Sequence, residues 1–447
     1  MDLTFELVVI GGGAAGLGAA RSAARAGRRV ALVTAGEIGG DCTFTGCVPS
    51  KTLIEAAEQR LTFERAMRRV NETINRIAAT ESADVLRAEG IEVIEGHAAF
   101  RDAHHLDVGG TVLRADHIVI ATGSSPVVPQ SLSGAGILTT DTFWSQSSAP
   151  ASLAIVGGGA ISCELAQATA RFGVPVSLVE GSQQLLPLEE PDVAVVVRAA
   201  LERDGVKVRV GSTVESLDCQ GLTLADGEPV TADRVLVAIG RRPDTLGLQV
   251  QAAGVDVDEA GYLVTDDKLR TTAPHIYAAG DVTGRMPFTH AADAMGRLAA
   301  RNAFAAAGRR FDTDPIPWVI FTDPEVARVG LREDQASEHD RVAYLPLEEV
   351  DRAITAGRTE GFVRIIAGPR RGAGSIGGGR VLGATIVAPR AGEMIGELAL
   401  AMRTSMFTGR LAQTVHAYPT YSVALQQAAT QFFTTIGGRT ARQAGRS

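Results

Sequence analysis

Residues 39–51, Gly-Gly-Asp-Cys-Thr-Phe-Thr-Gly-Cys-Val-Pro-Ser-Lys, contain two cysteines, Cys42 and Cys47, with four residues between them. They follow a glycine-rich loop at residues 11–16, and the pattern predicts that they open the next helix. The N-terminus of a helix favours a thiolate, because its unpaired N–H groups and its dipole stabilise negative charge. A thiol pair in this place is suited to cycling between dithiol and disulfide, whereas two buried structural cysteines would stay inert.

The glycine loop lies inside a predicted βαβ unit. An apolar strand at residues 5–10 precedes it, an alanine-rich helix follows to about Ala26, and a second strand runs from Arg29 to Val33. The glycines of such a loop permit a tight bend and bring the backbone close to a pyrophosphate. The glycines in question are Gly11, Gly13 and Gly16.

The same pattern recurs in the middle of the chain. A strand at residues 152–156 leads into Gly157, Gly159 and Ser162, and a helix is predicted through Phe172. Repetition makes a dinucleotide site a much stronger interpretation than one motif alone. We therefore expect two nucleotide-binding units.

The residues that end the second strand of each unit differ. Strand 175–179 ends in Glu180, where an acid binds a ribose 2′-hydroxyl. No arginine follows in residues 181–184 to bind a 2′-phosphate, so NADH is favoured over NADPH. In the first unit the neutral residue Thr34 occupies this position, and Glu37 follows three residues later. Which group binds the ribose in this unit stays open.

Two further segments are predicted as strands that end near a ligand. Residues 116–124 end in a small-residue turn with Thr122 and Gly123, and residues 276–281 end in Gly280 and Asp281. Open α/β sheets bind ligands at the carboxyl ends of their strands. Asp281 is therefore placed to accept hydrogen bonds from a bound nucleotide's hydroxyl groups.

Composition narrows the class of protein. The 447 residues suggest about three domains, with 45% hydrophobic and 21% charged residues. A net charge of −8 argues against nucleic acid or an anionic membrane as partner. We expect no signal peptide and no membrane helix. With only four cysteines, we also expect no structural disulfide framework. These expectations together favour a cytoplasmic location. The two cysteines outside the pair, Cys163 and Cys219, are expected to be structural. No metal site is expected.

At this point the chain resembles the pyridine-nucleotide disulfide oxidoreductases, the flavoprotein group of dihydrolipoamide dehydrogenase, glutathione reductase and mercuric reductase. The resemblance covers nearly the whole sequence and includes the first glycine loop, GGDCTFTGCVPSK, ATGSSP at 121–126, GGGAISCE at 157–164, GRRP at 240–243, YAAGD at 277–281 and FTDPEVARVG at 321–330. It implies an α/β fold with two Rossmann-like domains, for FAD and for NAD, and a C-terminal α+β dimerisation domain. The implied boundaries are 1–145 with 265–315 for FAD, 146–264 for NAD(P) and 316–447 for the interface of a homodimer.

The resemblance also assigns roles to residues. Cys47 would be the thiolate next to the flavin, Cys42 the interchange thiol that meets the acceptor, Lys51 the lysine beside the flavin, and Glu164 its acidic partner. Tyr418 would complete the active site of the partner subunit. Cofactor contacts are implied for Gly11, Gly13, Gly16, Thr34, Gly40, Lys51, Ala98, Thr122, Gly123, Gly157, Gly159, Ser162, Glu180, Gly240, Gly280, Asp281 and Thr289.

The C-terminal segment departs from the family pattern. Relatives that reduce free disulfides carry His-Pro-Thr-x-x-Glu, but here Tyr418 takes the place of the histidine and Val423 that of the glutamate. A phenol with a pKa near 10 cannot shuttle protons as imidazole does. We therefore expect poor activity on dihydrolipoamide or glutathione disulfide. His416 lies two residues away, and whether it substitutes is left open.

The electron acceptor is accordingly open. An activated sulfur species such as hypothiocyanous acid, or a small disulfide, needs little general acid and fits best. Mercuric ion is the first alternative, because tyrosine also occurs at this position in mercuric reductases. Against it, we expect no additional N-terminal metal-binding domain, and residues 431–447 hold no cysteine pair. A flavin-only quinone, dye or oxygen reductase and a flavin-bearing redox sensor are the remaining alternatives.

Overall fold

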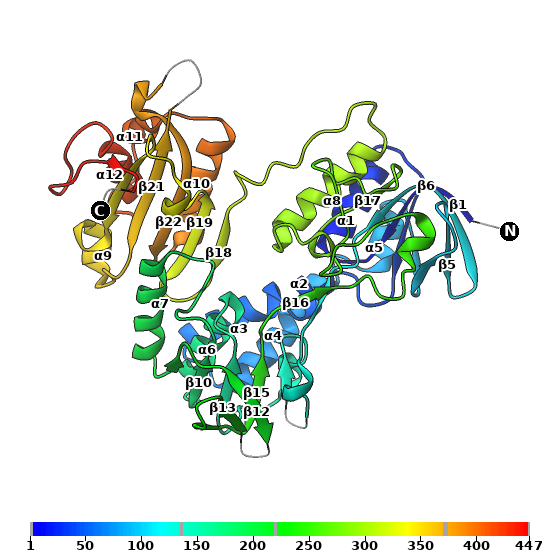
Figure 1. Cartoon of the computed structure of the whole chain (residues 1–447), viewed down its shortest axis with the longest axis horizontal. Helices are drawn as coiled ribbons and strands as arrows, with labels where there is room; N and C mark the ends of the chain where they lie inside the picture. Colours follow the sequence, from blue (N-terminus) through cyan, green and yellow to red (C-terminus); the bar gives the residue numbers. More distant parts are fainter. Residues whose placement is uncertain (1–2, 135–136, 219–220, 370–373, 446–447) are drawn as a thin grey trace. The chain divides into compact units, whose positions relative to one another are not determined.

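A computed structural model describes residues 3–134, 137–218, 221–369 and 374–445 (Figure 1). Its contacts divide the chain into two compact units, Met1–Pro150 with Arg234–Phe311, and Ala151–Asp233 with Asp312–Ser447. The chain is a mixed α/β protein, as the sequence predicts. The two units do not decide the three domain boundaries, which stay a prediction.

The first unit is built on a seven-stranded sheet ordered β3-β2-β1-β6-β5-β4, with β17 paired to β6. β1 runs parallel to β2 and β6, so that Leu7 lies opposite Val30 on one side and His117 on the other. All five residues of β2 are buried, as expected for a central parallel strand. The strands are β1 Leu3–Ile10, β2 Val30–Thr34, β3 Ile91–Glu95, β4 Ala98–Phe100, β5 His105–Val108, β6 Thr111–Ile120 and β17 Ile276–Ala278.

Two helices of this unit, α1 and α8, pack very closely. A Cβ atom on Gly296 would lie 1.9 Å from the carbonyl oxygen of Ala15, so only glycine permits this contact. The helices are α1 Ala14–Arg25, α2 Gly40–Phe44, α3 Cys47–Glu58, α4 Phe63–Ala78, α5 Ala83–Ala88 and α8 Thr289–Ala303, with the 3₁₀ turns η1 Gln130–Leu132, η2 Phe143–Ser145, η3 Val250–Ala253 and η4 Asp281–Thr283. Two short strand pairs complete the unit: β7 Ser124–Pro126 with β16 Arg241–Pro243, and β8 Ile137–Thr139 with β15 Arg234–Val237.

The second unit begins with the second βαβ motif. Its strands β9, β10 and β11 are parallel, and β12, β13 and β14 form a small antiparallel sheet. The elements are β9 Leu153–Val156, α6 Ala160–Arg171, β10 Val176–Val179, α7 Pro191–Arg203, β11 Lys207–Arg209, β12 Val214–Asp218, β13 Gly221–Leu224 and β14 Pro229–Thr231.

The rest of this unit is a six-stranded antiparallel sheet with helices, ordered β18-β19-β22-β21-β20-β23. Its central strand β21 is buried along its whole length, beneath a core that includes apolar residues of α10 and α12. The elements are β18 Trp318–Ile320, β19 Glu325–Gly330, η5 Glu333–Gln335, β20 Arg341–Pro346, η6 Leu347–Glu349, α9 Asp351–Ala356, β21 Phe362–Gly368, η7 Ile376–Gly378, β22 Arg380–Ala388, α10 Ala391–Arg403, α11 Thr408–Gln413, α12 Val423–Thr430 and β23 Arg442–Gln443.

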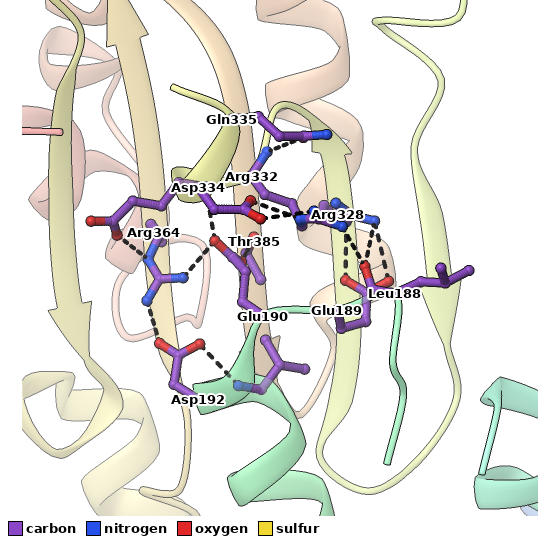
Figure 2. A network of polar contacts seen from close by, with 12 residues as sticks. Leu188, Glu189, Glu190, Asp192, Arg328, Arg332, Asp334, Gln335, Arg364 and Thr385 are labelled. Atoms are coloured by element: carbon purple, nitrogen blue, oxygen red, sulfur yellow. Dashed lines mark hydrogen bonds and ion pairs between the residues drawn. The ribbon is translucent and has the colours of Figure 1, made fainter. Parts of the chain in front are cut away.

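A buried polar network joins the start of α7 to this sheet (Figure 2). Arg328 of β19 pairs with Glu189, and Arg364 of β21 pairs with Glu190 and Asp192. The guanidinium of Arg328 also lies 4.0 Å from the ring centroid of Trp318. Because buried charges are unfavourable unless paired, the network fixes the acidic segment before α7 against the sheet.

The expected strands and helices are present within one or two residues, except that β6 begins several residues earlier. The cysteine segment differs from the expectation, because Cys42 lies in the short helix α2 and only Cys47 opens α3. Gly46 separates the two helices, and a Cβ atom there would lie 2.8 Å from the carbonyl oxygen of Asp41. Within the described ranges, no helix is both long and apolar enough to cross a membrane. Cys219 lies outside the described residues.

Candidate flavin, thiol and nicotinamide nucleotide sites

A cavity of about 630 Å³ lies within the first unit. The ends of β1, β2 and β6 reach it, together with the first glycine loop and the start of α8. Of the predicted flavin contacts, those that line it are Gly11, Gly13, Thr34, Gly40, Ala98, Thr122, Gly123, Gly280, Asp281 and Thr289. Gly16, Lys51 and Gly240 are not among its lining residues. The cavity thus brings these residues together, and their role in binding FAD stays a prediction.

The glycine loop has the geometry that a pyrophosphate site requires. Gly11 has a φ of +113°, and a Cβ atom there would lie 2.2 Å from the carbonyl oxygen of Ala121. A Cβ atom on Gly16 would lie 1.8 Å from the carbonyl oxygen of Gly11. Gly13 has no atom near its Cβ position and precedes α1, whose N-terminus receives no hydrogen bond from a capping side chain in the described structure. Its N–H groups and dipole favour a phosphate.

Two polar side chains support a dinucleotide in the cavity. The hydroxyl of Thr122 is buried and has no hydrogen-bond partner among the described residues, which is unusual for a buried polar atom. Asp281 accepts a hydrogen bond from Ser124, at 2.9 Å, and keeps further acceptor capacity towards the cavity that both residues line. These residues fit a flavin dinucleotide.

Thr34 lies where the sequence comparison of the two units places a ribose contact. Its side chain faces the first glycine loop, because a Cβ atom on Gly12 would lie 2.9 Å from its hydroxyl oxygen. That hydroxyl donates to the carbonyl oxygen of Gly36 at 2.9 Å. Glu37 lines the same cavity, and which group binds the ribose there stays open.

The two cysteines are free thiols in this structure, which corresponds to the reduced form. Cys42 lines the cavity, and the Cys47 sulfur lies 3.2 Å from the hydroxyl of Thr289. The hydrogen bond with Cys47 raises the pKa of the Cys42 thiol, and burial raises it further. Cys47 is the first residue of α3, where the helix N-terminus favours a thiolate. The two sulfurs therefore occupy different electrostatic environments.

The backbone between the two cysteines is held from a distant part of the chain. The indole N–H of Trp144 lies 2.8 Å from the carbonyl oxygen of Thr45 and 2.8 Å from that of Thr140. Thr45 directly precedes Gly46, so this contact fixes the link between α2 and α3.

Sequence reasoning missed an ionic network beside the cysteines. Arg241 of β16 pairs with Asp41 and with Asp141, and it donates to the hydroxyl of Ser124 at 2.8 Å. Ser124 in turn donates to Asp281, which links the thiol segment to the cavity wall. Asp41 lies inside the cysteine motif, and its charge at this position was the sequence signal that could have indicated the network.

The second nucleotide-binding unit has the expected loop. Glu180 accepts hydrogen bonds from the N–H groups of Gly158, at 2.5 Å, and Ser182, at 2.6 Å. The loop residues Gly157, Gly159 and Ser162 lead into α6, and the buried hydroxyl of Ser162 has no partner within the described structure. Cys163 is fully buried, and burial raises the pKa of its thiol, which suits a structural residue.

Glu164 and Lys51 lie in different units, so their predicted pairing stays a prediction. Glu164 is buried and accepts a hydrogen bond from the N–H of Phe321 at 2.8 Å. Lys51 donates to the hydroxyl of Ser50 at 3.2 Å. Glu164 thus connects α6 to the segment at residues 321–330, which is one of the motifs shared with the resembling family.

The C-terminal segment 414–422 connects α11 to α12. Tyr418 is exposed, and its hydroxyl donates to a carboxylate oxygen of Asp351 at 2.8 Å. Val423 is the first residue of α12 and offers no carboxylate. Among the described residues, no group of three or more His, Cys, Asp or Glu side chains could hold a metal ion.

Comparison with protein families gives two matches. Residues 5–296 match the model of pyridine nucleotide-disulphide oxidoreductase, and residues 316–429 match its dimerisation domain.

The chain belongs to the pyridine nucleotide-disulphide oxidoreductase family. It is therefore an oxidoreductase of a family that uses FAD and NAD(P)H, and it carries the domain through which family members form homodimers.

Individual relatives fall into two groups by activity. Dihydrolipoyl dehydrogenase of Chlamydia muridarum is 34% identical over 94% of this chain and 95% of its own. Mercuric reductase of Streptomyces lividans is also 34% identical, over 97% of both chains. Near-equal identity to both groups means that overall similarity does not decide the acceptor.

Solved structures add a third kind of relative. The HOCl-induced flavoprotein disulfide reductase RclA from Escherichia coli is 31% identical, covers 95% of this chain and 99% of its own, and superimposes with a TM-score of 0.86. LpdA from Mycobacterium tuberculosis is 30% identical over 97% of this chain and 100% of its own, with a TM-score of 0.87. These matches show a flavoprotein disulfide reductase fold across nearly the whole chain.

Proposed function

We propose that this protein is a homodimeric, NADH-dependent FAD oxidoreductase that passes electrons through the Cys42–Cys47 pair to an atypical acceptor. The acceptor class is an activated sulfur species, such as hypothiocyanous acid, or a small disulfide. Glutathione disulfide and lipoamide are poor substrates in this proposal. A cytoplasmic location is part of the same proposal.

One observation carries it: the thiol pair beside the cavity is combined with an altered acid–base segment. The thiol pair, Thr289 and the cavity are all in place, yet Tyr418 and Val423 replace the histidine and glutamate of relatives that reduce free disulfides. A thiol leaving group needs a proton, which a histidine–glutamate dyad supplies. An activated sulfur compound releases a weakly basic group and does not need this help.

Gly11, Thr122 and Asp281 would help to hold FAD in the cavity, where the flavin would supply two-electron transfer between NADH and the disulfide. The chain would supply the other parts: the Thr289 hydroxyl lies 3.2 Å from the Cys47 sulfur, and Cys42, once it has lost its proton, attacks the acceptor sulfur. With hypothiocyanous acid, hydroxide leaves and a Cys42 sulfenyl thiocyanate forms. Cys47 then attacks Cys42, thiocyanate leaves, and the disulfide is restored, so one acceptor consumes the two electrons of one NADH.

NADH is the proposed coenzyme because of Glu180. Its carboxylate lies at the second glycine loop, as its hydrogen bond with Gly158 supports. An anionic side chain at this place accepts ribose hydroxyls and repels a 2′-phosphate.

A turnover screen with purified holoenzyme tests the proposal. With NADH, we expect fast reduction of hypothiocyanous acid and little reduction of glutathione disulfide or lipoamide. Reduction with about two electrons per subunit should give a long-wavelength absorbance band that disappears in Cys47→Ser. Tyr418→Phe should slow the acceptor half-reaction in stopped flow and leave flavin reduction by NADH unchanged. Brisk turnover of glutathione disulfide would refute the argument from the altered segment.

Mercuric ion reduction is the second candidate. The mercuric reductases among the relatives favour it, as does the tyrosine at position 418. A soft cation needs thiolates to displace its ligands, and the tail at residues 431–447 contains no cysteine. NADH-dependent release of volatile mercury at a rate above that with hypothiocyanous acid would establish this candidate instead.

A further inference from the structure

The segment that carries Tyr418 is fixed by its own subunit. The imidazole of His416 lies 3.0 Å from the nearer carboxylate oxygen of Glu397 on α10, and its side chain is only 7% exposed. Its other ring nitrogen lies 3.1 Å from the carbonyl oxygen of Thr414. His416 thus contacts its own subunit through both nitrogens and anchors the segment that carries Tyr418.

Tyr418 stands out from this anchored segment. Its side chain is 72% exposed, and its hydroxyl donates to Asp351, the first residue of α9, at 2.8 Å. The next residue of α9, Arg352, places its guanidinium 5.7 Å from the ring centroid of Tyr421. Two consecutive residues of α9 therefore contact both tyrosines of the segment. Because the phenol proton points to Asp351, the lone pairs of the phenol oxygen are the part offered to a ligand.

Charge is the second consequence of this contact. Asp351 forms no ion pair within the described part of the chain, so its negative charge is not neutralised by a direct partner. The hydrogen bond to the carboxylate raises the pKa of the Tyr418 phenol. Because the phenol keeps its proton more firmly, the negative charge of the pair lies on the carboxylate.

Building on the function proposed above, we propose that Asp351 is a positioning residue of the acceptor site that also selects acceptors by charge. It holds the phenol of Tyr418 in place, and its carboxylate disfavours anionic acceptors relative to neutral and cationic ones. The acid form of hypothiocyanous acid is neutral, whereas its conjugate base and glutathione disulfide are anionic, so the same residue would favour the acid form over both anions.

Three disulfides of different charge test the proposal with the holoenzyme: anionic 5,5′-dithiobis(2-nitrobenzoate), neutral 4,4′-dithiodipyridine and cationic cystamine. Asp351→Asn keeps a hydrogen-bond acceptor for the phenol and removes the charge. We expect it to raise kcat/KM for the anion relative to cystamine by about 3–10-fold at low salt, the range for removing one partly screened charge. The fold-change in this kcat/KM ratio should fall towards 1 in 0.5 M NaCl, because salt screens exposed charges.

The matched control is Glu348→Gln, which removes another exposed acid from the adjacent turn η6. It should change the ratio less than twofold. Asp351→Ala removes both the charge and the hydrogen-bond acceptor for the phenol. Besides the charge effect, it should lower kcat/KM for the neutral disulfide about as much as Tyr418→Phe does. If Asp351→Asn changes all three substrates equally, or none, the charge-selecting role is wrong.

A second measurement does not depend on the acceptor. In a Cys47→Ser background, where Cys42 is the remaining thiol of the pair, the holoenzyme is alkylated with anionic iodoacetate and with neutral iodoacetamide, and the ratio of the two rates is compared with and without Asp351→Asn. An increase in the relative rate of alkylation by iodoacetate supports the inference, even if none of the tested acceptors is reduced. A lack of turnover would contradict only the proposed function. An unchanged ratio overturns the inference, whatever the acceptor.

Discussion

Glu190 and Arg364 form an ion pair in which both side chains are almost completely buried. A carboxylate oxygen lies 2.8 Å from a guanidinium nitrogen, and the exposed fractions are 6% and 8%. Glu190 also accepts from the hydroxyl of Thr385 at 2.8 Å and from the N–H of Glu333 at 3.0 Å. Figure 2 shows this pair at the point where α7 meets the antiparallel sheet.

Glu190→Gln should therefore destabilise the protein strongly, since it leaves Arg364 with less compensation in a buried place. We expect a loss of about 3–5 kcal/mol, seen as a lower unfolding temperature or denaturant midpoint. Glu202→Gln is the control, because Glu202 pairs with Arg198 on the surface, where such pairs contribute about 0.2–1 kcal/mol. Equal effects of the two variants would contradict the structural role of the buried pair.

The neighbouring Glu189 should give the network an unusual pH dependence. Burial raises its pKa, although Arg328 opposes this shift. A carboxyl group with a raised folded-state pKa stabilises the fold below its unfolded pKa, about 4.3, and loses this contribution as pH rises through the folded pKa. The stability of wild type relative to Glu189→Gln should thus fall as pH increases from about 4 towards neutrality. Unfolding temperatures of both proteins across this range test the sign, and a rising difference would refute it.

Glu180 should control the choice of coenzyme. We expect NADH to be preferred over NADPH by about tenfold or more in kcat/KM, in line with a charged hydrogen bond of about 1.5–3 kcal/mol. Glu180→Gln should reduce this preference, mainly through KM, because the repulsion of the 2′-phosphate is lost. Glu202→Gln, a surface variant in the same nucleotide-binding unit, should leave the ratio unchanged. A wild-type enzyme that uses NADPH equally well would contradict our interpretation of the loop.

Thr289 should stabilise the thiolate of Cys47. Its hydroxyl lies 3.2 Å from the sulfur, and a hydrogen bond donated to a thiolate lowers the thiol pKa. In Thr289→Val, the long-wavelength band of the reduced enzyme should appear at a pH higher by about 1 unit, equivalent to about 1.4 kcal/mol. Thr52→Val is a suitable control, because its hydroxyl donates to the carbonyl oxygen of Val48 on the same helix. A midpoint that stays in place or moves down would show that the contact does not influence the thiolate.

Much of the candidate site could be predicted from local sequence. Glycine loops, strand ends and a cysteine at a helix start each depend on a few consecutive residues, which is why the sequence could propose Gly11, Cys47 and Asp281. In the structure Gly11 and Asp281 line the cavity and Cys47 begins α3. Contacts between distant residues could not be predicted in this way. Asp41 and Arg241 are 200 positions apart, and Tyr418 and Asp351 are 67 apart. No periodicity or motif connects such pairs, so only the fold brings them together.

The hydrogen bond from Trp144 to Thr45 has a consequence for repeated turnover. It fixes the peptide between the two short helices, so the backbone that carries the sulfurs has little freedom to move. Oxidation and reduction of the pair would therefore act on a backbone that is held in place from a distant part of the chain. The natural fluorescence of Trp144, whose indole bonds this peptide, then offers a direct readout of any movement at the link.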